Sequence, residues 1–280
     1  MSDSPAQPIG RARTRPSDPA PDDTDVPDLP VASAIEPNAY TGSVRRRWLL
    51  TCCVGAVAGG AAWLIYEQTH GQLRVDEMVR SRAESARPSS DDMSRFRAAE
   101  ERVATGRTML AYGLVAACVA AGSGLGLGRP VAGRHGKLLI GKAIALAALG
   151  GLVGGAVAPH AIAFLPAEDH IEPVQRAIAI QAVAWMLAGA GVGWASAIHQ
   201  GRGCRKLASS ATGAACGLIA ALLFIPLAGI VLPESNVDFA VPRDAPGRFL
   251  WSVCGALALA AGWTAALAPQ PSASESEPSG

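Results

Sequence analysis

Long apolar windows alternate with short polar segments along most of the chain. Six windows carry almost no charge: 48–66, 109–128, 138–158, 177–198, 207–225 and 249–267. A helix needs about 20 apolar residues to cross a hydrocarbon core of about 30 Å. The windows lack the alternation that marks the strands of a membrane barrel. The pattern predicts an all-α fold, a polytopic membrane helical bundle with six transmembrane helices.

The two ends of the chain have the composition of disordered segments. Residues 1–44 contain eight prolines and few large apolar side chains, and residues 268–280 are rich in serine, proline and glutamate. Such segments bury too little surface to offset the entropy of ordering. We expect disordered tails, either plain linkers or docking segments. The first apolar window starts too late for a signal peptide, so residues 45–66 are expected to be an uncleaved anchor.

The longest polar segment, residues 67–108, predicts an αα-hairpin outside the membrane. It carries eight arginines and eight acids. Residues 72–86 suit a first helix, and Ser90 is expected to cap a second one that runs into the next window. Met93, Phe96, Ala99 and Val103 would share one face of that helix. Two interpretations stay open: a hairpin that binds a partner, and a cap that packs over the bundle.

Two similar segments indicate an internal repeat of helical hairpins. The segment "PHAIAFLP" (159–166) recurs as "PLAGIVLP" (226–233), 67 residues later, and "AGSGLG" (121–126) recurs as "AGAGVG" (188–193) at the same offset. We therefore expect one unit over 109–166 and a second over 167–233. The last outer loop and helix (234–267) could complete a third unit with the first helix, if these two helices are neighbours. Pro159 and Pro226 are expected to mark kinks or ends of helices.

Glycines four residues apart suggest close helix packing in five of the six windows. Lipid is as apolar as leucine, so membrane helices associate through small residues that let backbones approach. The packing candidates are Gly55, Gly59, Gly122, Gly126, Gly150, Gly154, Gly189, Gly193, Gly213 and Gly217. Trp185 is expected to pack inside the bundle. Five other tryptophans near window ends are expected at the headgroup level: Trp48, Trp63, Trp194, Trp251 and Trp263.

Basic residues in short connections indicate the orientation. Three connections carry three basic residues each: 45–47, 129–137 and 202–206. The pattern places both termini in the cytoplasm. Arginine outnumbers lysine 21 to 3 in a chain that is 50% hydrophobic and 17% charged, with abundant alanine and glycine. This bias favours a bacterial inner membrane. The net charge of +1 indicates no nucleic-acid partner.

Groups that could carry chemistry are scarce in the windows. Lys142 is their only charged residue, and no serine there has a matched base. This pattern argues against an enzyme and against a bound cofactor. His160 and His170 share a loop with acids, but without a recognised metal-ligand spacing, so no metal is expected. A set of six polar residues could line an inner vestibule for anions, or simply form hydrogen bonds to helix backbones. They are Lys142, Ser123, Ser196, Ser209, Ser210 and Thr212.

Residues 107–233 resemble uncharacterised glycine-rich bacterial polytopic membrane regions, through "AGSGLG", "GGLVGG" (150–155) and "AGAGVG". Such regions sometimes accompany forkhead-associated or kinase signalling domains. The resemblance implies membrane localisation and an assembly role, with no activity or site. The sequence predicts a structural, anchoring or interaction protein whose partners are the lipid bilayer and a membrane protein or a second copy. The alternative is a channel or facilitator for a small neutral or anionic solute.

Overall fold

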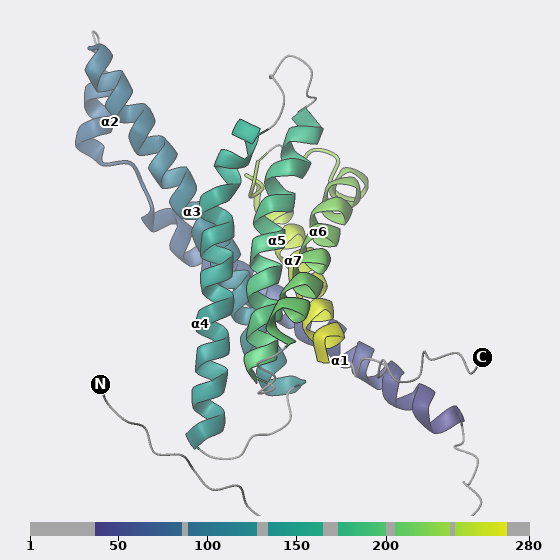
Figure 1. Ribbon diagram of the computed structural model, residues 1–280. Coiled ribbons are helices and arrows are strands. Elements are labelled where there is room, and N and C mark those ends of the chain that lie inside the picture. Colours follow the sequence, from purple (N-terminus) through teal and green to yellow (C-terminus); the bar gives the residue numbers. More distant parts are fainter. Residues whose placement is uncertain are drawn as a thin grey trace, which may run out of the picture.

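The computed structural model describes residues 37–85, 89–127, 134–164, 173–199, 205–235 and 239–267. This part of the chain is helical and contains no strand (Figure 1). Its α-helices are α1 (Pro37–Thr69), α2 (Glu77–Ala83), α3 (Ser90–Gly126), α4 (Arg134–Val157), α5 (Pro173–His199), α6 (Lys206–Val231) and α7 (Ala245–Leu267). Two short 3-10 helices, η1 (His70–Gln72) and η2 (Ala158–Phe164), follow α1 and α4.

Six of these helices are long and apolar enough to cross a membrane: α1, α3, α4, α5, α6 and α7. Each covers all or nearly all of one of the six apolar windows. The predicted polytopic helical bundle is therefore confirmed, and the chain is a multi-pass membrane protein. In lipid a helix satisfies its own backbone hydrogen bonds, which is why these windows form helices and not open strands.

The six membrane helices form an inner and an outer set. Inner helices α3, α5 and α7 contact one another, while α1, α4 and α6 lie around them. In the apolar stretches of the inner helices 50–56% of residues are buried, against 28–33% in the outer ones. Around the bundle the helices touch in the order α1, α3, α4, α5, α6, α7 and back to α1. Helices α1 and α7 are thus the neighbours that a third repeat unit requires, although the duplication itself stays a prediction.

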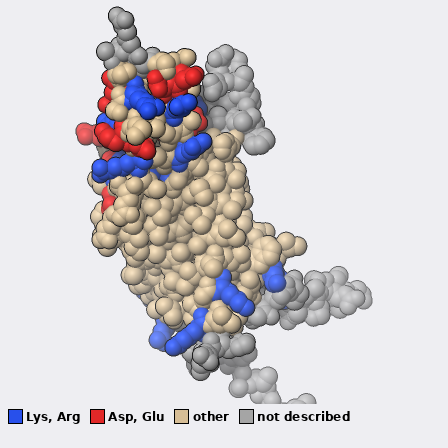
Figure 2. All heavy atoms as spheres, turned by 90° about the vertical axis from the view of Figure 1, so that its left-hand side faces the viewer, with Lys and Arg blue, Asp and Glu red and all other residues tan. Residues whose placement is uncertain are grey.

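The two ends of the bundle differ in charge. At one end, called the basic end, the described charges are all positive: Arg45, Arg46, Arg47, Lys137, Arg205 and Lys206. At the other, called the hairpin end, both signs occur side by side (Figure 2). All ten described carboxylates lie beyond or close to the helix termini at the hairpin end: Glu67, Asp76, Glu77, Glu84, Asp91, Asp92, Glu100, Glu101, Glu234 and Asp244.

The predicted hairpin is present, with shifted boundaries. Its first helix, α2, is shorter than expected, and its N-cap Asp76 accepts a hydrogen bond from the Met78 N–H at 2.9 Å. The cap of α3 is Ser89 and not the expected Ser90. Ser89 accepts from the Asp92 N–H at 3.1 Å, and the Asp92 carboxylate accepts from the Ser89 N–H at 3.2 Å. This reciprocal pair needs an acid three residues after the cap, which only Ser89 has.

One further boundary differs from the sequence prediction, and Pro159 and Pro226 differ from each other in where they lie relative to a helix. Helix α1 begins at Pro37, inside the segment predicted to be disordered, with proline at the first helical position where a missing N–H costs nothing. Pro159 follows the end of α4, as expected. Pro226 lies inside α6, which continues to Val231. Ending the helix there would leave several backbone groups unpaired in apolar surroundings, whereas continuing costs one hydrogen bond.

Candidate functional site

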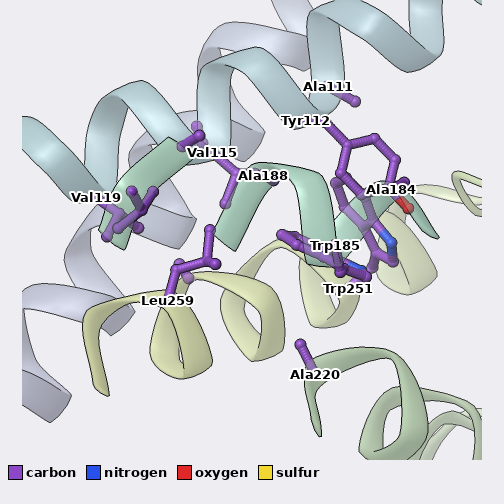
Figure 3. Packing of buried hydrophobic residues seen from close by; sticks show 14 of the residues in the cluster. Ala111, Tyr112, Val115, Val119, Ala184, Trp185, Ala188, Ala220, Trp251 and Leu259 are labelled. Atoms are coloured by element: carbon purple, nitrogen blue, oxygen red, sulfur yellow. The ribbon is translucent and has the colours of Figure 1, made fainter. Parts of the chain in front are cut away.

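Three aromatic rings fill the centre of the inner helices towards the hairpin end (Figure 3). Tyr112 of α3, Trp185 of α5 and Trp251 of α7 are at most 2% exposed. The centroid of the Tyr112 ring is 4.8 Å from that of Trp185 and 4.9 Å from that of Trp251, and the two indoles are 4.8 Å apart. Such aromatic pairs contribute about 0.5–1.5 kcal/mol each beyond the area they bury. Trp251 is thus a core residue and not the headgroup anchor that its position suggested.

Two buried donors hold the loop before α7 over this aromatic cluster. The Tyr112 hydroxyl donates to the carbonyl of Ala240, and the Gln181 amide donates to the carbonyl of Phe239, both at 3.1 Å. Gln181 is 0% exposed and lies one helical turn from Trp185. Both hydrogen bonds are partly buried, and they fix the loop relative to α3 and α5. The loop therefore closes the interior at the hairpin end.

Asp244 joins this loop to the first turn of α7. Its carboxylate accepts from the Gly247 N–H at 2.8 Å and from the Ser235 hydroxyl at 2.6 Å. This is the geometry of an N-cap, which satisfies an otherwise unpaired donor of the first helical turn. Burial of the carboxyl raises its pKa, but these hydrogen bonds outweigh burial, so the pKa of Asp244 is lowered below its usual range.

A bidentate ion pair ties α1 to α7 beside the loop. The Arg248 guanidinium contacts both carboxylate oxygens of Glu67, at 2.6 and 3.0 Å. Its remaining amino group donates to the carbonyl of Arg243. The Arg243 guanidinium in turn lies over the Phe239 ring, 3.8 Å from the centroid. A fork of this kind fixes direction as well as distance, so it sets how α1 sits on α7.

Space at this site is too small for a substrate. A hollow between α1, α3 and α7 has a cavity volume of about 10 Å³. It is lined by Trp63, Trp251, Arg248 and mostly apolar neighbours. A cavity of this size holds at most about one water molecule. The indole N–H groups of Trp63 and Trp251 have no partner in the described part of the chain.

The hydrogen bonds and the ion pair of this site hold helices and a loop together. Most of its polar groups donate to backbone carbonyls or pair with each other, while the two indole N–H groups, the Gln181 amide oxygen and one Asp244 oxygen have no partner in the described part of the chain. Among the described residues no three histidine, cysteine or acidic side chains cluster as metal ligands. The loop with His170 lies outside the described residues, so the structure does not place that histidine.

The six residues predicted to line an inner vestibule have different surroundings in the described part of the chain. Lys142 is exposed on α4, on the outside of the bundle. Ser196 donates to Gly193 of its own helix, and Thr212 donates to Ala208. None of the six lines the hollow between α1, α3 and α7 or the one on the hairpin of α2 and α3. Ser123 and Ser209 are buried. Ser210 donates from α6 to Ala190 of α5 at 3.1 Å, so it joins two packed helices.

Eight of the ten predicted glycines face the backbone of a neighbouring helix. A Cβ added at Gly59 of α1 would lie 2.7 Å from the Val253 Cα of α7, and one at Gly150 of α4 would lie 2.8 Å from the Gly191 Cα of α5. Both distances are well below van der Waals contact. The others in this position are Gly55, Gly154, Gly189, Gly193, Gly213 and Gly217. Gly122 and Gly126 instead face the Val54 side chain, at 3.1 and 3.2 Å.

Sequence reasoning missed several residues that shape this interior. Gly151 and Gly155 of α4 lie against the backbones of Tyr112 and Met109, and the Trp185 ring lies over Gly255 of α7. Gly151 and Gly155 have the four-residue spacing inside "GGLVGG" and were recognisable. Gln181 was also recognisable, because it is the one amide side chain in the six apolar windows.

The chain has no match among known proteins in three comparisons: no protein-family model, no curated protein and no solved structure matches it. Its function is therefore inferred from its own residues.

Proposed function

We propose that the protein is a non-enzymatic membrane anchor that binds a partner protein through the hairpin of α2 and the first half of α3. The observation that carries the proposal is a closed, aromatic-filled interior combined with a charged hairpin that stands off the bundle (Figure 1). A filled interior suits a structural role better than solute passage.

The hairpin is long enough to project well outside the membrane. Helix α3 has 37 residues, which span about 55 Å. Since the hydrocarbon core is about 30 Å thick, about 25 Å of α3 lies beyond it. Helix α2 packs along α3, and the Arg107 guanidinium donates to the Leu73 carbonyl at 2.8 Å at the hairpin base. The alternative interpretation expected the hairpin to pack over the bundle as a cap, whereas it stands off the bundle (Figure 1). This arrangement leaves its surface open to a partner.

The surface of the hairpin fits a polar protein partner with both signs of charge. Its exposed groups include Glu77, Arg82, Glu84 and Arg95. Met78, in the first turn of α2, is 63% exposed beside them. Mixed charges around one large apolar side chain favour a protein surface over nucleic acid, which needs a uniformly basic patch.

The proposed location is the bacterial inner membrane, with both termini in the cytoplasm. The basic end supports this orientation, since basic residues collect on the cytoplasmic side of short connections. The hairpin would then lie on the opposite, outer side. The resemblance to membrane regions beside signalling domains agrees with an assembly role, and we propose that role for the whole chain.

Crosslinking in native membranes tests the partner. The hairpin contains acids but no lysine, so a carboxyl-directed crosslinker is the suitable reagent. We expect intermolecular crosslinks from Glu77, Glu84 and Glu100, identified by mass spectrometry. Replacing these three with glutamine should abolish them, whereas Glu234→Gln, at an exposed position in another loop, should not. Crosslinks only within the hairpin would refute the proposal.

Reconstitution tests the competing facilitator role. Purified protein in liposomes should give no uptake of small neutral or anionic solutes above that of protein-free liposomes. Saturable uptake would replace the anchoring proposal with the facilitator, even if crosslinks were found.

A further inference from the structure

A hollow lies between α2 and the first turns of α3, on the hairpin that stands off the bundle (Figure 1). Its volume is about 60 Å³, and it is lined by Met78, Val79 and Arg82 of α2 and by Asp92 and Arg95 of α3. A cavity needs about 10–15 Å³ for each water molecule, so this hollow has room for about four water-sized groups. The end of an acidic side chain, one methylene and a carboxylate, has the same number of heavy atoms.

The two arginines of the hollow have no carboxylate partner. No carboxylate oxygen in the described part of the chain lies within 4.0 Å of either guanidinium. Arg80, on the same short helix, does pair with Glu84 at 2.9 Å. Arg82 instead donates to the Met78 sulfur at 3.9 Å, and a thioether is a weak acceptor. Both guanidiniums of the hollow therefore keep donors for an incoming anion.

Asp92 does not neutralise these two charges. Its carboxylate accepts from the N–H of Ser89 at 3.2 Å and from the Ser89 hydroxyl at 2.6 Å, as part of the cap of α3. Two guanidiniums and one carboxylate give the lining a net charge of +1. A single carboxylate matches that charge. A phosphate, with a charge of about −1.5 to −2 at neutral pH, would exceed it and would be repelled by Asp92.

We infer that this hollow binds an aspartate or glutamate side chain of the partner protein. The carboxylate would accept from the guanidiniums of Arg82 and Arg95, and the aliphatic part of the side chain would contact Met78 and Val79. A guanidinium presents its donors as a planar fork, so two of them on different helices fix the direction of the acid. The inference rests on the proposed function, for which it specifies the chemistry of the partner.

The test starts by capturing the partner with a photoreactive residue at Ser81. This position is exposed on α2 and does not line the hollow, so the five lining residues stay intact. Mass spectrometry of the adduct formed in intact cells identifies the partner and the residue to which it is joined. Capture alone does not support the inference. The identified partner is therefore purified and titrated against the full-length chain in lipid nanodiscs, and the Kd is measured.

The Kd of each arginine variant measures the contribution of the hollow. We expect Arg82→Gln and Arg95→Gln to raise the Kd about threefold each, and the double variant about tenfold. Arg97→Gln is the matched control, because it removes the same charge from an exposed position of α3 about 200° around the helix from Arg95. It should leave the Kd within about 1.5-fold of wild type. Circular dichroism of each variant establishes that it is folded.

Two further measurements identify the group that occupies the hollow. Glutamine in place of the acid nearest the crosslinked residue of the partner should remove the difference between the wild-type chain and the double variant, because the two sites act on one contact. At equal ionic strength N-acetylglutamate should compete with the partner, whereas N-acetylglutamine should not. Stronger competition by inorganic phosphate than by N-acetylglutamate would identify a phosphate as the occupant and overturn the inference.

The remaining outcomes separate this inference from the proposed function. If the partner binds but the Kd is unchanged by Arg82→Gln and Arg95→Gln, only the inference is overturned. Equal effects of these variants and of Arg97→Gln would indicate diffuse attraction and would also overturn the inference alone. The absence of any protein adduct from Ser81 of the otherwise unaltered chain would overturn the proposed function, and the inference with it.

Discussion

The crossing of α5 and α6 allows a direct test of the glycine packing. Gly217 of α6 lies against the backbone of Trp185, and an added Cβ would approach the Trp185 carbonyl carbon to 2.6 Å. Ordinary carbon contacts lie at about 3.5–4.0 Å, so Gly217→Ala requires the helices to separate by about 1 Å. Gly229 lies on the same helix, and a Cβ there would meet nothing within 4 Å. Gly229→Ala is therefore the matched control.

The two substitutions should change stability in opposite directions. Alanine is preferred over glycine in a helix by about 1 kcal/mol, and this gain applies at both sites. At Gly217 the overpacking costs about 1–3 kcal/mol, and a gap of about 1 Å also forfeits part of the dispersion energy along the crossing. We expect Gly217→Ala to lower the free energy of unfolding by about 1–2 kcal/mol net. Gly229→Ala should leave it unchanged or raise it by up to about 1 kcal/mol.

The assay is reversible unfolding of the purified protein in mixed micelles with increasing sodium dodecyl sulfate, followed by far-ultraviolet circular dichroism. Each variant is compared with wild type at the same micelle composition. If both alanines gave the same change, α5 and α6 would not meet at Gly217, and the reasoning about glycine contacts would be refuted.

Three further predictions concern the site at the hairpin end. Asp244→Ala should cost about 1 kcal/mol of stability at pH 7. The folded pKa of Asp244 is lowered, so its stabilisation is present above the unfolded pKa of about 3.9 and disappears as the pH falls through the folded pKa. The difference in thermal stability between variant and wild type should therefore be smaller at pH 3 than at pH 7. Gln181→Leu removes the donor to Phe239 and should cost about 1 kcal/mol, with faster amide exchange in the loop before α7; unchanged exchange would contradict the contact. Glu67→Gln leaves the Arg248 charge without its partner and should lower the free energy of unfolding in micelles by about 1–3 kcal/mol. An unchanged free energy of unfolding would indicate that the ion pair is exposed to water.

Much of the fold was predictable because a membrane imposes strong rules on sequence. Apolar length alone identified the six membrane helices, since only helices satisfy their backbones in lipid. A third repeat unit would require the first and last helices to be neighbours, and α1 does contact α7, although the repeat itself stays a prediction. Glycine spacing pointed to surfaces where backbones approach, because close approach requires small residues at fixed intervals.

The candidate site was less predictable, because it depends on which face of each helix turns inwards. Trp251 and Lys142 both lie near window ends, where either face could have been expected. One is buried in the core and the other faces lipid. The hydrogen bonds of Tyr112 and Gln181 reach a loop 128 and 58 residues away in sequence. No local pattern encodes such contacts, because they arise only when the loop folds back over the inner helices.

The central claim, that the hairpin binds a partner while the bundle only anchors it, is tested most directly by a photoreactive residue at Met78. Val57 on α1 provides the control, since it is 73% exposed but lies within a membrane helix. After irradiation of intact cells, the anchoring account predicts a discrete protein adduct from position 78 and lipid adducts only from position 57. A protein adduct from position 57 with none from position 78 would contradict it.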